Sequence, residues 1–564
     1  MLNCRCLTRP VLLTLILLSA CAAADPPAPG SDPAPRVAPG ASGAFLQGRF
    51  ALGSAELPDA ADAFLRALAA DPDNTELRQQ AFLASVMAGR PEAITLAQGL
   101  PDSPAALLVL AGQDVAAGRW AAAESKFGKL PGQDANQVLR PLLVAWARQG
   151  AGRTDDAVAE LRPFEENPQY RGLFALHTAL IDDLAGRQAD AGREYGVAEA
   201  NSGGLNLRLG TILASWQART GHEAEARRII QAMVGSASGL AIAEPALQLD
   251  ASHVQVGSAA DGIAETYLAL AATLQRQNAS EFSLLLLHLA LQLRPEFTAA
   301  RLLMSDLQLD SRQFGLASAT LAAVPASDSL IAIVRLRQAN IVERQGRIDD
   351  AASMLEEIAV AYPQRPEPFA MLAEMQRAAG HFAQAAATYG RAIERLPNPG
   401  PNDWVMFYQQ GTAYERAHQW PQAEADFLHA LELSPDQPAV LNYLGYSWAE
   451  QGRNLPRARQ MLERAVELRP DDGAIVDSLG WVLLRQGDTA GAARWLERAV
   501  ELEPEDWSIN AHLGDAYWEA GRHAEAQTQW RRALILHPEP EDAEKLRAKL
   551  AGNVPPASAQ RSAP

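Results

Sequence analysis

The sequence repeats itself at a nearly constant interval. Four similar segments end in proline: "ALELSP" at Pro435, "AVELRP" at Pro470, "AVELEP" at Pro504 and "ALILHP" at Pro538. Pro363 and Pro397 are separated by the same interval, and the step from Pro397 to Pro435 is slightly longer because "NPGPND" is inserted. A period of about this length predicts a repeat protein whose units are stabilised by stacking on their neighbours.

One unit, residues 507–538, reads "WSINAHLGDAYWEAGRHAEAQTQWRRALILHP". Its apolar residues have helical spacing on both sides of Gly521, which predicts a helix, a turn and a second helix. Small and large residues alternate where the two helices approach each other, as close packing requires: Gly514, Ala526 and Ala533 are small, and Leu513, Tyr517 and Trp530 are large. The final proline ends the second helix, because its ring cannot continue the hydrogen-bond ladder.

These positions and their period resemble the tetratricopeptide repeat, whose unit is about 34 residues long. Other units carry the same pattern: Leu479, Gly480, Ala492, Leu496 and Ala499; Leu444, Gly445, Ala458, Leu462 and Ala465; Gly411, Tyr414, Ala423, Phe427 and Ala430. Looser copies reach towards the N-terminus, for example Gly48 with Phe64, and Gly210 with Ile230. The resemblance implies an all-α solenoid, a right-handed superhelix of antiparallel helix pairs. We expect a degenerate array over residues 44–234, a loop or insertion at 235–262, and a second array at 263–550.

The chain begins with an export signal. Arg5 and Arg9 precede the apolar "VLLTLILL", which is too short to be a stable membrane anchor, and small residues follow it. Residues 18–21, "LSAC", resemble the lipobox of bacterial lipoproteins, so we expect cleavage after residue 20 and a lipid on Cys21. The alternative is ordinary cleavage after residues 22–24, which would leave a soluble periplasmic protein. Cys4 and Cys6 leave with the signal either way, so no internal disulfide is expected.

Composition separates the lipidated start from the folded part. Residues 21–43 are rich in Ala, Pro and Gly and are expected to form a flexible tether, while residues 551–564 are expected to be a disordered tail. The chain has a net charge of −18, which becomes −20 once the signal with its two arginines is removed. An acidic chain without basic clusters repels phosphate backbones, so we expect a neutral or basic protein partner and no nucleic acid.

Catalytic motifs are missing from the sequence. It has no G-x-S-x-G, no H-E-x-x-H and no phosphate-binding G-x-x-x-x-G-K-[ST]. The stretch "HEAEA" at His222 lacks the second histidine of a zinc site, because Ala226 stands there, and His512 and His523 have no metal-ligand spacing. We therefore predict no enzyme activity, no metal and no cofactor. The rival hypothesis, a hydrolase site in the 235–262 insertion, would have to use His253 and Asp261.

In tetratricopeptide-repeat proteins the first helix of each pair lines the concave groove. Transferred by position, the resemblance implies a mixed aromatic, acidic and arginine lining made by Tyr408, Glu415, Arg416, Asn442, Tyr446, Asp477, Trp481, Arg485, Asp515 and Trp518. Aromatic residues and arginine dominate binding hot spots. The alternative for Tyr446 and Trp481 is a place in the core between repeats. Acidic residues stand where a lysine and asparagine clamp for a C-terminal carboxylate would need lysines, so such a ligand is not expected.

Signal, lipobox, tether and repeats together resemble the large tetratricopeptide-repeat lipoproteins of Gram-negative outer membranes. The stretches "VLNYLGYSWAEQGR", "DSLGWVLLRQGD" and "HLGDAYWEAGRHAEA" resemble those of a lipoprotein adaptor that brings a periplasmic carboxyl-terminal processing protease to its substrates. The resemblance implies a lipid-anchored scaffold at the outer membrane, facing the periplasm. The alternative within this class is a role in outer-membrane assembly or polysaccharide export. The sequence does not specify an oligomeric state.

Overall fold

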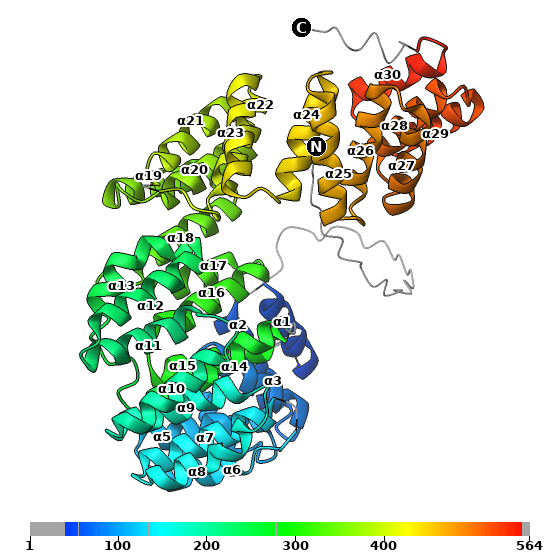
Figure 1. Cartoon of the computed structure of the whole chain (residues 1–564). Coiled ribbons are helices and arrows are strands. Elements are labelled where there is room, and N and C mark those ends of the chain that lie inside the picture. The colour runs from blue at the N-terminus through cyan, green and yellow to red at the C-terminus, as the bar shows by residue number, and fades with distance from the viewer. Residues whose placement is uncertain (1–39, 55, 134, 277–278, 397, 555–564) are drawn as a thin grey trace, which may run out of the picture. The chain divides into compact units, whose positions relative to one another are not determined.

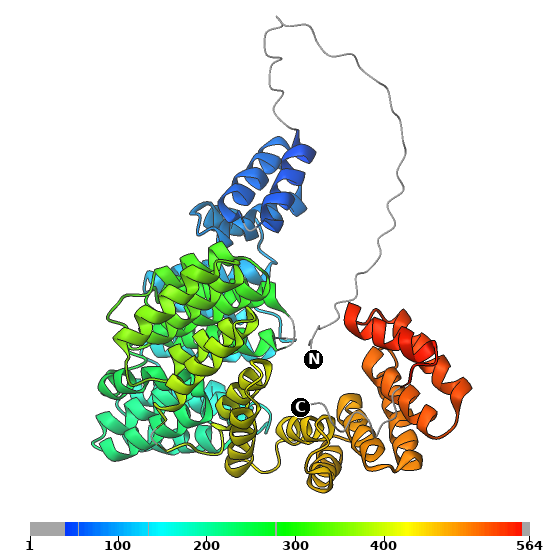
Figure 2. The ribbon, with the colours of Figure 1, turned by 90° about the horizontal axis from the view of Figure 1, so that it is seen from above.

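The computed structural model of the chain describes residues 40–54, 56–133, 135–276, 279–396 and 398–554. Within these ranges it contains thirty α-helices, one short 3-10 helix and no strand (Figure 1, Figure 2). The prediction of an all-α solenoid of helix pairs is therefore confirmed. The chain divides into two compact units, residues 1–84 and residues 85–564.

The first unit contains α1 (Ala41–Gly53), α2 (Leu57–Ala70) and most of α3 (Thr75–Met87), whose last residues belong to the second unit. Helices α1 and α2 form the first pair. Gly48 lies against the Phe64 ring so closely that an added Cβ would be 2.8 Å from it. The helical part thus begins at Ala41, three residues before the predicted start at 44.

The second unit continues as a series of short helices (Figure 1). Its first part contains α4 (Glu92–Gln98), α5 (Pro104–Ala116), α6 (Trp120–Gly128), α7 (Asn136–Gly150), α8 (Thr154–Glu165), α9 (Arg171–Leu184), α10 (Gln188–Ala200), α11 (Leu207–Arg219) and α12 (Glu223–Ser236). Its middle part contains η1 (Ser238–Ala243), α13 (Glu244–Asp250), α14 (Ala259–Gln275), α15 (Ser280–Leu293), α16 (Thr298–Asp310), α17 (Phe314–Ala322), α18 (Ile331–Arg344), α19 (Ile348–Ala361), α20 (Glu367–Ala378) and α21 (Phe382–Ile393). Its last part contains α22 (Trp404–Arg416), α23 (Trp420–Leu433), α24 (Pro438–Glu450), α25 (Leu455–Leu468), α26 (Gly473–Gln486), α27 (Thr489–Leu502), α28 (Trp507–Glu519), α29 (His523–Ile535) and α30 (Pro540–Leu550).

The small residues of the repeat lie where the two helices of a pair touch. A Cβ added to Gly411 would be 2.7 Å from the Phe427 ring, and one added to Gly445 would be 2.8 Å from Leu462. Gly514 packs equally closely on the Trp530 indole. Because these contacts leave no room for a side chain, they confirm the register that the sequence assigned to the C-terminal repeats.

Two repeat boundaries are made by a proline and a capping aspartate. Two residues after Pro504, Asp506 Oδ1 accepts hydrogen bonds from the backbone N–H groups of Ser508 (2.7 Å) and Ile509 (3.0 Å), which begins α28. Two residues after Pro470, Asp472 Oδ1 accepts from Ile475 N at 3.2 Å and begins α26. Proline stops one helix and the carboxylate satisfies the free N–H groups of the next, so the boundary is set by local sequence.

Residues 235–262 are more ordered than the predicted loop. They contain η1 and α13, and α14 begins at Ala259, where Ser258 Oγ caps the Asp261 N–H at 3.1 Å. Leu247 of α13 is 4 % exposed, so this helix is packed on the array. The prediction of a loop was wrong for residues 238–250. The Ser, Gly and Ala content hid two helices too short to show helical periodicity.

Helix α14 covers the first helices of earlier repeats. It packs on α7 and α9, and α15 packs on α5. Gly262 of α14 lies directly against the indole of Trp146 on α7, with no room for a Cβ. The buried carboxylate of Glu265 on α14 forms ion pairs with Arg208 and, at 3.3 Å, with Arg294. The inner face of this part of the solenoid is therefore occupied by the chain itself.

The last helix, α30, packs on α29 through Leu546, which is buried. Beyond it, Val554 also packs on the core of the C-terminal repeats, so the first four residues of the predicted tail, 551–554, are ordered. The rest of that tail, the signal, Cys21 and the predicted tether up to residue 39 lie outside the described residues. Among the residues that the structure describes, no helix has the length and apolar character needed to cross a membrane.

Candidate functional site

The candidate site is the face formed by α22, α24, α26 and α28, the first helices of four successive pairs, which we term the first-helix face. All ten residues that the sequence assigned to a groove lie on these helices. The structure divides them into three groups. The residues of α26 are buried, those of α24 and α28 are partly exposed, and those of α22 are partly exposed except for Arg416, which is exposed.

The three groove residues predicted on α26 form an internal cluster. Asp477 and Trp481 are each 6 % exposed and Arg485 is 2 % exposed. The Trp481 indole stacks on the His512 ring of α28, and the Arg485 guanidinium lies 5.9 Å from the Trp481 ring centre. Arg485 Nη2 also donates to the backbone oxygen of Glu450 at 3.1 Å. The structure thus places Trp481 in the core between repeats, which is the alternative that the sequence left open.

His512 was not among the predicted site residues, although it links α26 to α28. Its Nδ1 lies 2.9 Å and 3.0 Å from the two oxygens of Asp477. Burial lowers the pKa of His512, but the charge and hydrogen bond of Asp477, together with the charges of Glu450 and Asp515, outweigh burial and raise it above the ordinary value. The buried pair thus favours the protonated imidazole inside the repeat stack. The pair holds two repeats together and does not resemble a nucleophile with its base, since no hydroxyl or thiol contacts it among the described residues.

Tyr446 lies at the edge of this cluster. Its ring centre is 6.3 Å from that of His512, and the side chain is half-buried. Burial and the negative charges of Glu450, Asp477 and Asp542 raise the pKa of its hydroxyl. Tyr446 is therefore a neutral phenol that joins the buried cluster to the accessible part of the face.

The accessible part lies on α22 and α24. Tyr408 and Asn442 are one repeat length apart, hold the same position in successive repeats and are both partly exposed. Asn442 Oδ1 is buried and has no hydrogen-bond partner among the described residues. A buried polar atom without a partner costs free energy. The exposed parts of the two side chains, and not this oxygen, are the surface that a partner could contact.

Aromatic rings surround that position. Tyr408 has ring centres 6.0 Å away on Trp404, Phe427 and Tyr443, and Phe427 and Tyr443 are 5.2 Å apart. Only Phe427 is fully buried, while the other three rings are half-buried. Clustered rings with exposed edges offer a large, rigid contact area at low entropic cost.

The two charged residues predicted on α22 are already engaged. Glu415 accepts a hydrogen bond from the Tyr443 hydroxyl at 3.0 Å, and burial together with Glu415 raises the pKa of Tyr443 above its ordinary range. Arg416 is exposed, with its guanidinium 4.7 Å above the Phe382 ring of the preceding repeat. Both residues hold neighbouring rings in place, and Arg416 keeps its outer side open to solvent.

The residues predicted on α28 contact the last helices. Both oxygens of Asp515 lie 2.7 Å from Lys549 Nζ of α30, and Oδ1 also accepts from Trp530 Nε1 at 2.9 Å. Trp518 packs against His523 and Trp530, with ring centres 4.2 Å and 5.4 Å away. Asp515 therefore stabilises the end of the array, and only the outer edge of Trp518 remains accessible.

The residues of the rival hydrolase hypothesis have structural roles. His253 pairs with Asp250 at 2.8 Å on an exposed turn, and Asp261 Oδ2 accepts the Gly257 N–H at 3.0 Å. His222 is exposed at the N-terminus of α12. Within the described ranges, no group of three or more His, Cys, Asp or Glu side chains could hold a metal ion.

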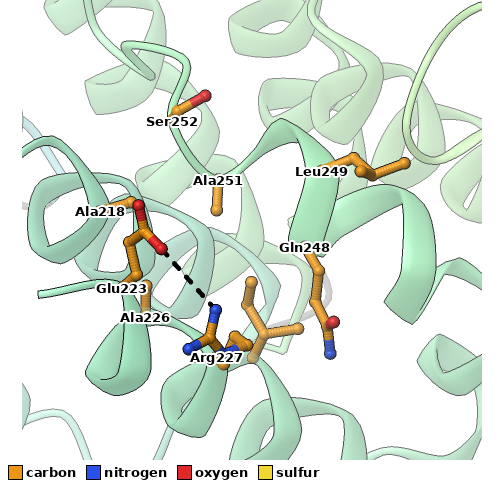
Figure 3. Close-up of a pocket in the computed structure, with 9 residues that line it drawn as sticks. Ala218, Glu223, Ala226, Arg227, Gln248, Leu249, Ala251 and Ser252 are labelled. Atoms are coloured by element: carbon orange, nitrogen blue, oxygen red, sulfur yellow. Dashed lines mark ion pairs between the residues drawn. The ribbon is translucent and has the colours of Figure 1, made fainter.

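One surface cavity of about 170 Å³ lies between α12 and α13 (Figure 3). Ala226 and Ile230 of α12 form part of its lining, and a loose ion pair between Glu223 and Arg227, at 3.9 Å, also lines it. Leu249, at the end of α13, is 83 % exposed. Of its other polar residues, Gln248 donates from Nε2 to Glu244 Oε1 at 3.0 Å.

Comparisons with known families agree with this architecture. Two family models described as "Tetratricopeptide repeat" match the chain, one at residues 302–366, 408–473 and 452–506, and the other at 483–550. No curated protein is similar enough to this chain to count as a relative.

Several solved structures match the chain at low identity. The tetramer of Cut9 and Hcn1 from the APC/C matches with 16% identity over 91% of this chain and 96% of that chain, at a TM-score of 0.38. Yeast Tom70 matches with 14% identity over 81% and 96%, at a TM-score of 0.32. YrrB, described as a TPR protein with an unusual peptide-binding site, matches with 19% identity over 35% and 98%, at a TM-score of 0.29. At these identities the likenesses concern the fold alone.

Proposed function

We propose that this chain is a non-catalytic scaffold or adaptor. The premise is that it is a tetratricopeptide-repeat protein over residues 302–366 and 408–550. Proteins of this family generally act as protein-protein interaction scaffolds. In this chain the partner would bind on the accessible part of the first-helix face, formed by α22 and α24. The observation that carries the proposal is the cluster of half-buried rings of Trp404, Tyr408 and Tyr443 on this face.

The first helices of earlier repeats are less suited to this role. The face of α5, α7 and α9 is occupied by α14 and α15, and Trp146 is fully buried beneath Gly262. On α26 the side chains of Asp477, Trp481 and Arg485 are used inside the stack. The surface of α22 and α24 is the part of the predicted groove that carries a cluster of partly exposed rings.

The charges on the first-helix face indicate which partner segments could bind there. The first helices α22, α24, α26 and α28 carry five acidic residues, Glu415, Glu450, Asp477, Asp515 and Glu519, against two arginines, Arg416 and Arg485. Of these, Asp477 and Asp515 are compensated by His512 and Lys549. Glu450 is exposed, so an acidic segment would be repelled there. A neutral or basic segment of a partner protein fits this face best.

The test uses photo-crosslinking in intact cells. A photoreactive amino acid at position 408 or 442 should form adducts with a partner protein that mass spectrometry can identify. Trp495, exposed on the second helix α27, is the matched control position and should give no such adduct. In the purified pair, the double change Tyr408→Ala and Asn442→Ala should weaken binding at least tenfold. Undiminished binding would remove this face from the proposal.

We further propose that the scaffold is attached to the cell envelope by a lipid on Cys21, in the outer membrane and facing the periplasm. The support is the sequence alone, the apolar run followed by "LSAC". Changing Cys21 to Ala should move the protein from the detergent-phase to the aqueous fraction and remove the mass of the lipid. A soluble periplasmic protein, cleaved after residues 22–24, would be unaffected by this change.

More specifically, we propose that the chain is an adaptor for a periplasmic carboxyl-terminal processing protease. The support is the resemblance of residues 440–453, 477–488 and 512–526 to such an adaptor. Purified chain should stimulate the protease while having no turnover of its own. If the captured partners are assembly factors of the outer membrane or polysaccharide export proteins, the alternative applies. Hydrolysis by the chain alone would contradict both.

A further inference from the structure

Helix α1 exposes two large apolar side chains on one side. Leu46 is 66 % exposed and Phe50 is 74 % exposed, and the two are one helical turn apart. The opposite side of the same helix, with Ala44, Gly48 and Ala51, is buried. Helix α1 is thus apolar on both sides, although only one of them is covered within its own unit.

The other terminal helix of the described chain behaves differently. The outward side of α30 carries Glu541, Glu544, Lys545 and Arg547, all exposed, while Ala543 and Leu546 are buried. Terminal helices of repeat arrays normally have this polar outer side, because they meet water. The outer side of α1 also exposes Gln47 and Arg49, but two large apolar side chains stand between and beside them, which indicates that this part of α1 meets something other than water.

The charge of α1 also stands apart from that of the chain. Arg49, which is exposed, is the single charged residue between Ala41 and Gly53, whereas the whole chain has a net charge of −18. Arg49 lies between Leu46 and Phe50 in sequence. A short apolar side flanked by a basic residue and free of acids suits the interface of an anionic bilayer, where aromatic rings and arginine are favoured.

Other occupants fit less well. Residues 22–39, which precede α1, contain one large apolar residue, Val37, and cannot cover two side chains. A stable protein interface buries about 800 Å² on each partner, more than two side chains provide. The proposed lipid on Cys21 would place a bilayer close to α1, because only residues 22–39 separate Cys21 from Gly40 at the start of that helix.

We propose that the side of α1 carrying Leu46, Arg49 and Phe50 rests on the surface of the bilayer to which the chain is anchored. This inference rests on the lipid anchor of the proposed function. The contact is too small to recruit the chain from solution. A tether raises the local concentration of α1 at the membrane to the millimolar range, which is sufficient to populate a weak contact. The anchored chain would then touch the membrane at two points and not only through its lipid.

The test supplies the anchor chemically, so its outcome does not depend on whether cells lipidate the chain. The processed chain, residues 21–564, contains Cys21 as its single cysteine, which couples to a maleimide lipid in vesicles of phosphatidylethanolamine and phosphatidylglycerol at a ratio of 3:1. A photoreactive phenylalanine replaces Phe50, or as a matched control replaces Ala69, which is exposed on α2. Lipid adducts should form at position 50 at least about fivefold more often than at position 69. Equal yields, or adducts with protein only at position 50, would overturn the proposal.

A second variant tests the charge. Arg49→Glu should lower the yield of lipid adducts at position 50 about fivefold or more in vesicles with phosphatidylglycerol, and little in vesicles of phosphatidylcholine alone. Because Arg49 is exposed, its replacement should leave the melting temperature unchanged, which excludes misfolding as the cause. If the yield of lipid adducts at position 50 changes neither with Arg49→Glu nor with the lipid composition, the bilayer contact is contradicted.

Discussion

The indole of Trp481 stacks on the imidazole of His512, with ring centres 4.2 Å apart and planes inclined by 25°. Trp146 and His177 hold the same positions in an earlier repeat, since tryptophan and histidine have the same separation in both pairs. There Trp146 Nε1 donates to His177 Nδ1 at 3.0 Å. The position of Asp477 is taken by Leu142, so no carboxylate charges the imidazole, and burial lowers the pKa of His177 to about 3. One substitution thus separates a neutral histidine from a charged one at the same position.

The charged histidine predicts a pH dependence for the C-terminal repeats. The folded pKa of His512 is raised, so the stability from its pair with Asp477 is fully present below about pH 6.5 and is lost as pH rises through the raised value. His512→Gln should remove this dependence and cost about 1.5–3 kcal/mol at pH 6. Hydrogen exchange of α26 and α28 at pH 6 and pH 8 measures it. The same change at the exposed His523 should leave exchange in α26 unaltered, and an equal effect there would contradict the assignment.

The carboxyl group of Asp426 predicts a second pH dependence of the stability. Asp426 on α23 is largely buried and its Oδ2 has no hydrogen-bond partner among the described residues. Burial raises the pKa of Asp426 to about 7, against a smaller opposing effect of His429. A raised folded pKa means that stability falls as pH rises from about 4 to about 7. Asp426→Asn should therefore stabilise the protein at pH 8 by about 1–2 kcal/mol, discounted for partial exposure, and have little effect at pH 4.

Thermal melting at both pH values checks this prediction. The exposed Asp436, which pairs with Arg464 at 2.9 Å, is the control. Asp436→Asn removes an ion pair and relieves no burial, so it should not raise the melting temperature at pH 8. A gain for both variants would point to net charge as the cause and not to the buried carboxyl.

The contact between α14 and α7 predicts a strong effect of a single methyl group. Gly262→Ala places a Cβ inside the Trp146 indole and should cost about 1–3 kcal/mol, because the two helices must move apart. Gly196 of α10 has open space around its Cα, so Gly196→Ala should be neutral or stabilise by about 0.5–1 kcal/mol. Urea unfolding followed by tryptophan fluorescence compares them. Equal losses would show that α14 does not lie on Trp146.

Replacing either of two lysines on α30 by alanine should lower the stability of the protein by different amounts. Lys549 is 16 % exposed and holds both oxygens of Asp515, so Lys549→Ala leaves a mostly covered carboxylate without its counter-charge and should cost about 1–3 kcal/mol. Lys545 is 60 % exposed in its pairs with Glu541 and Asp542, and Lys545→Ala should cost less than about 0.5 kcal/mol. Thermal melting of the two variants at moderate salt measures both losses. A comparable loss for both lysines would mean that α30 is not held through Asp515.

Local sequence was enough to predict the helix pairs. The contact of Gly514 with Trp530, the turn at Gly521 and the cap at Asp506 all involve residues within one repeat or at its boundary, where spacing and residue type determine the structure. The same positions in other repeats gave the register of the C-terminal array. The N-terminal boundary was wrong by three residues, because Gly40 and Ala41 have no capping side chain to mark the start of α1.

Contacts between repeats could not be predicted in the same way. Whether Trp481 faces a groove or the core depends on the small rotation between neighbouring repeats, which is not encoded at any single position. The fit of Gly262 on Trp146 joins residues several repeats apart and results from that rotation summed over the repeats between them. His512 was missed because its partner, Asp477, lies on the preceding first helix. The shared spacing from tryptophan to histidine, present twice in the chain, was the signal that could have found it.

The position of Gly262 on Trp146 also has a consequence for synthesis. A ribosome that adds about 5–20 residues per second needs roughly 6–23 s to pass from Trp146 to Gly262. During that interval α7 has been synthesised but α14 has not, so the Trp146 indole of the nascent chain is an exposed apolar surface. We expect slower translation over residues 147–262 to lengthen the time for which this surface is uncovered.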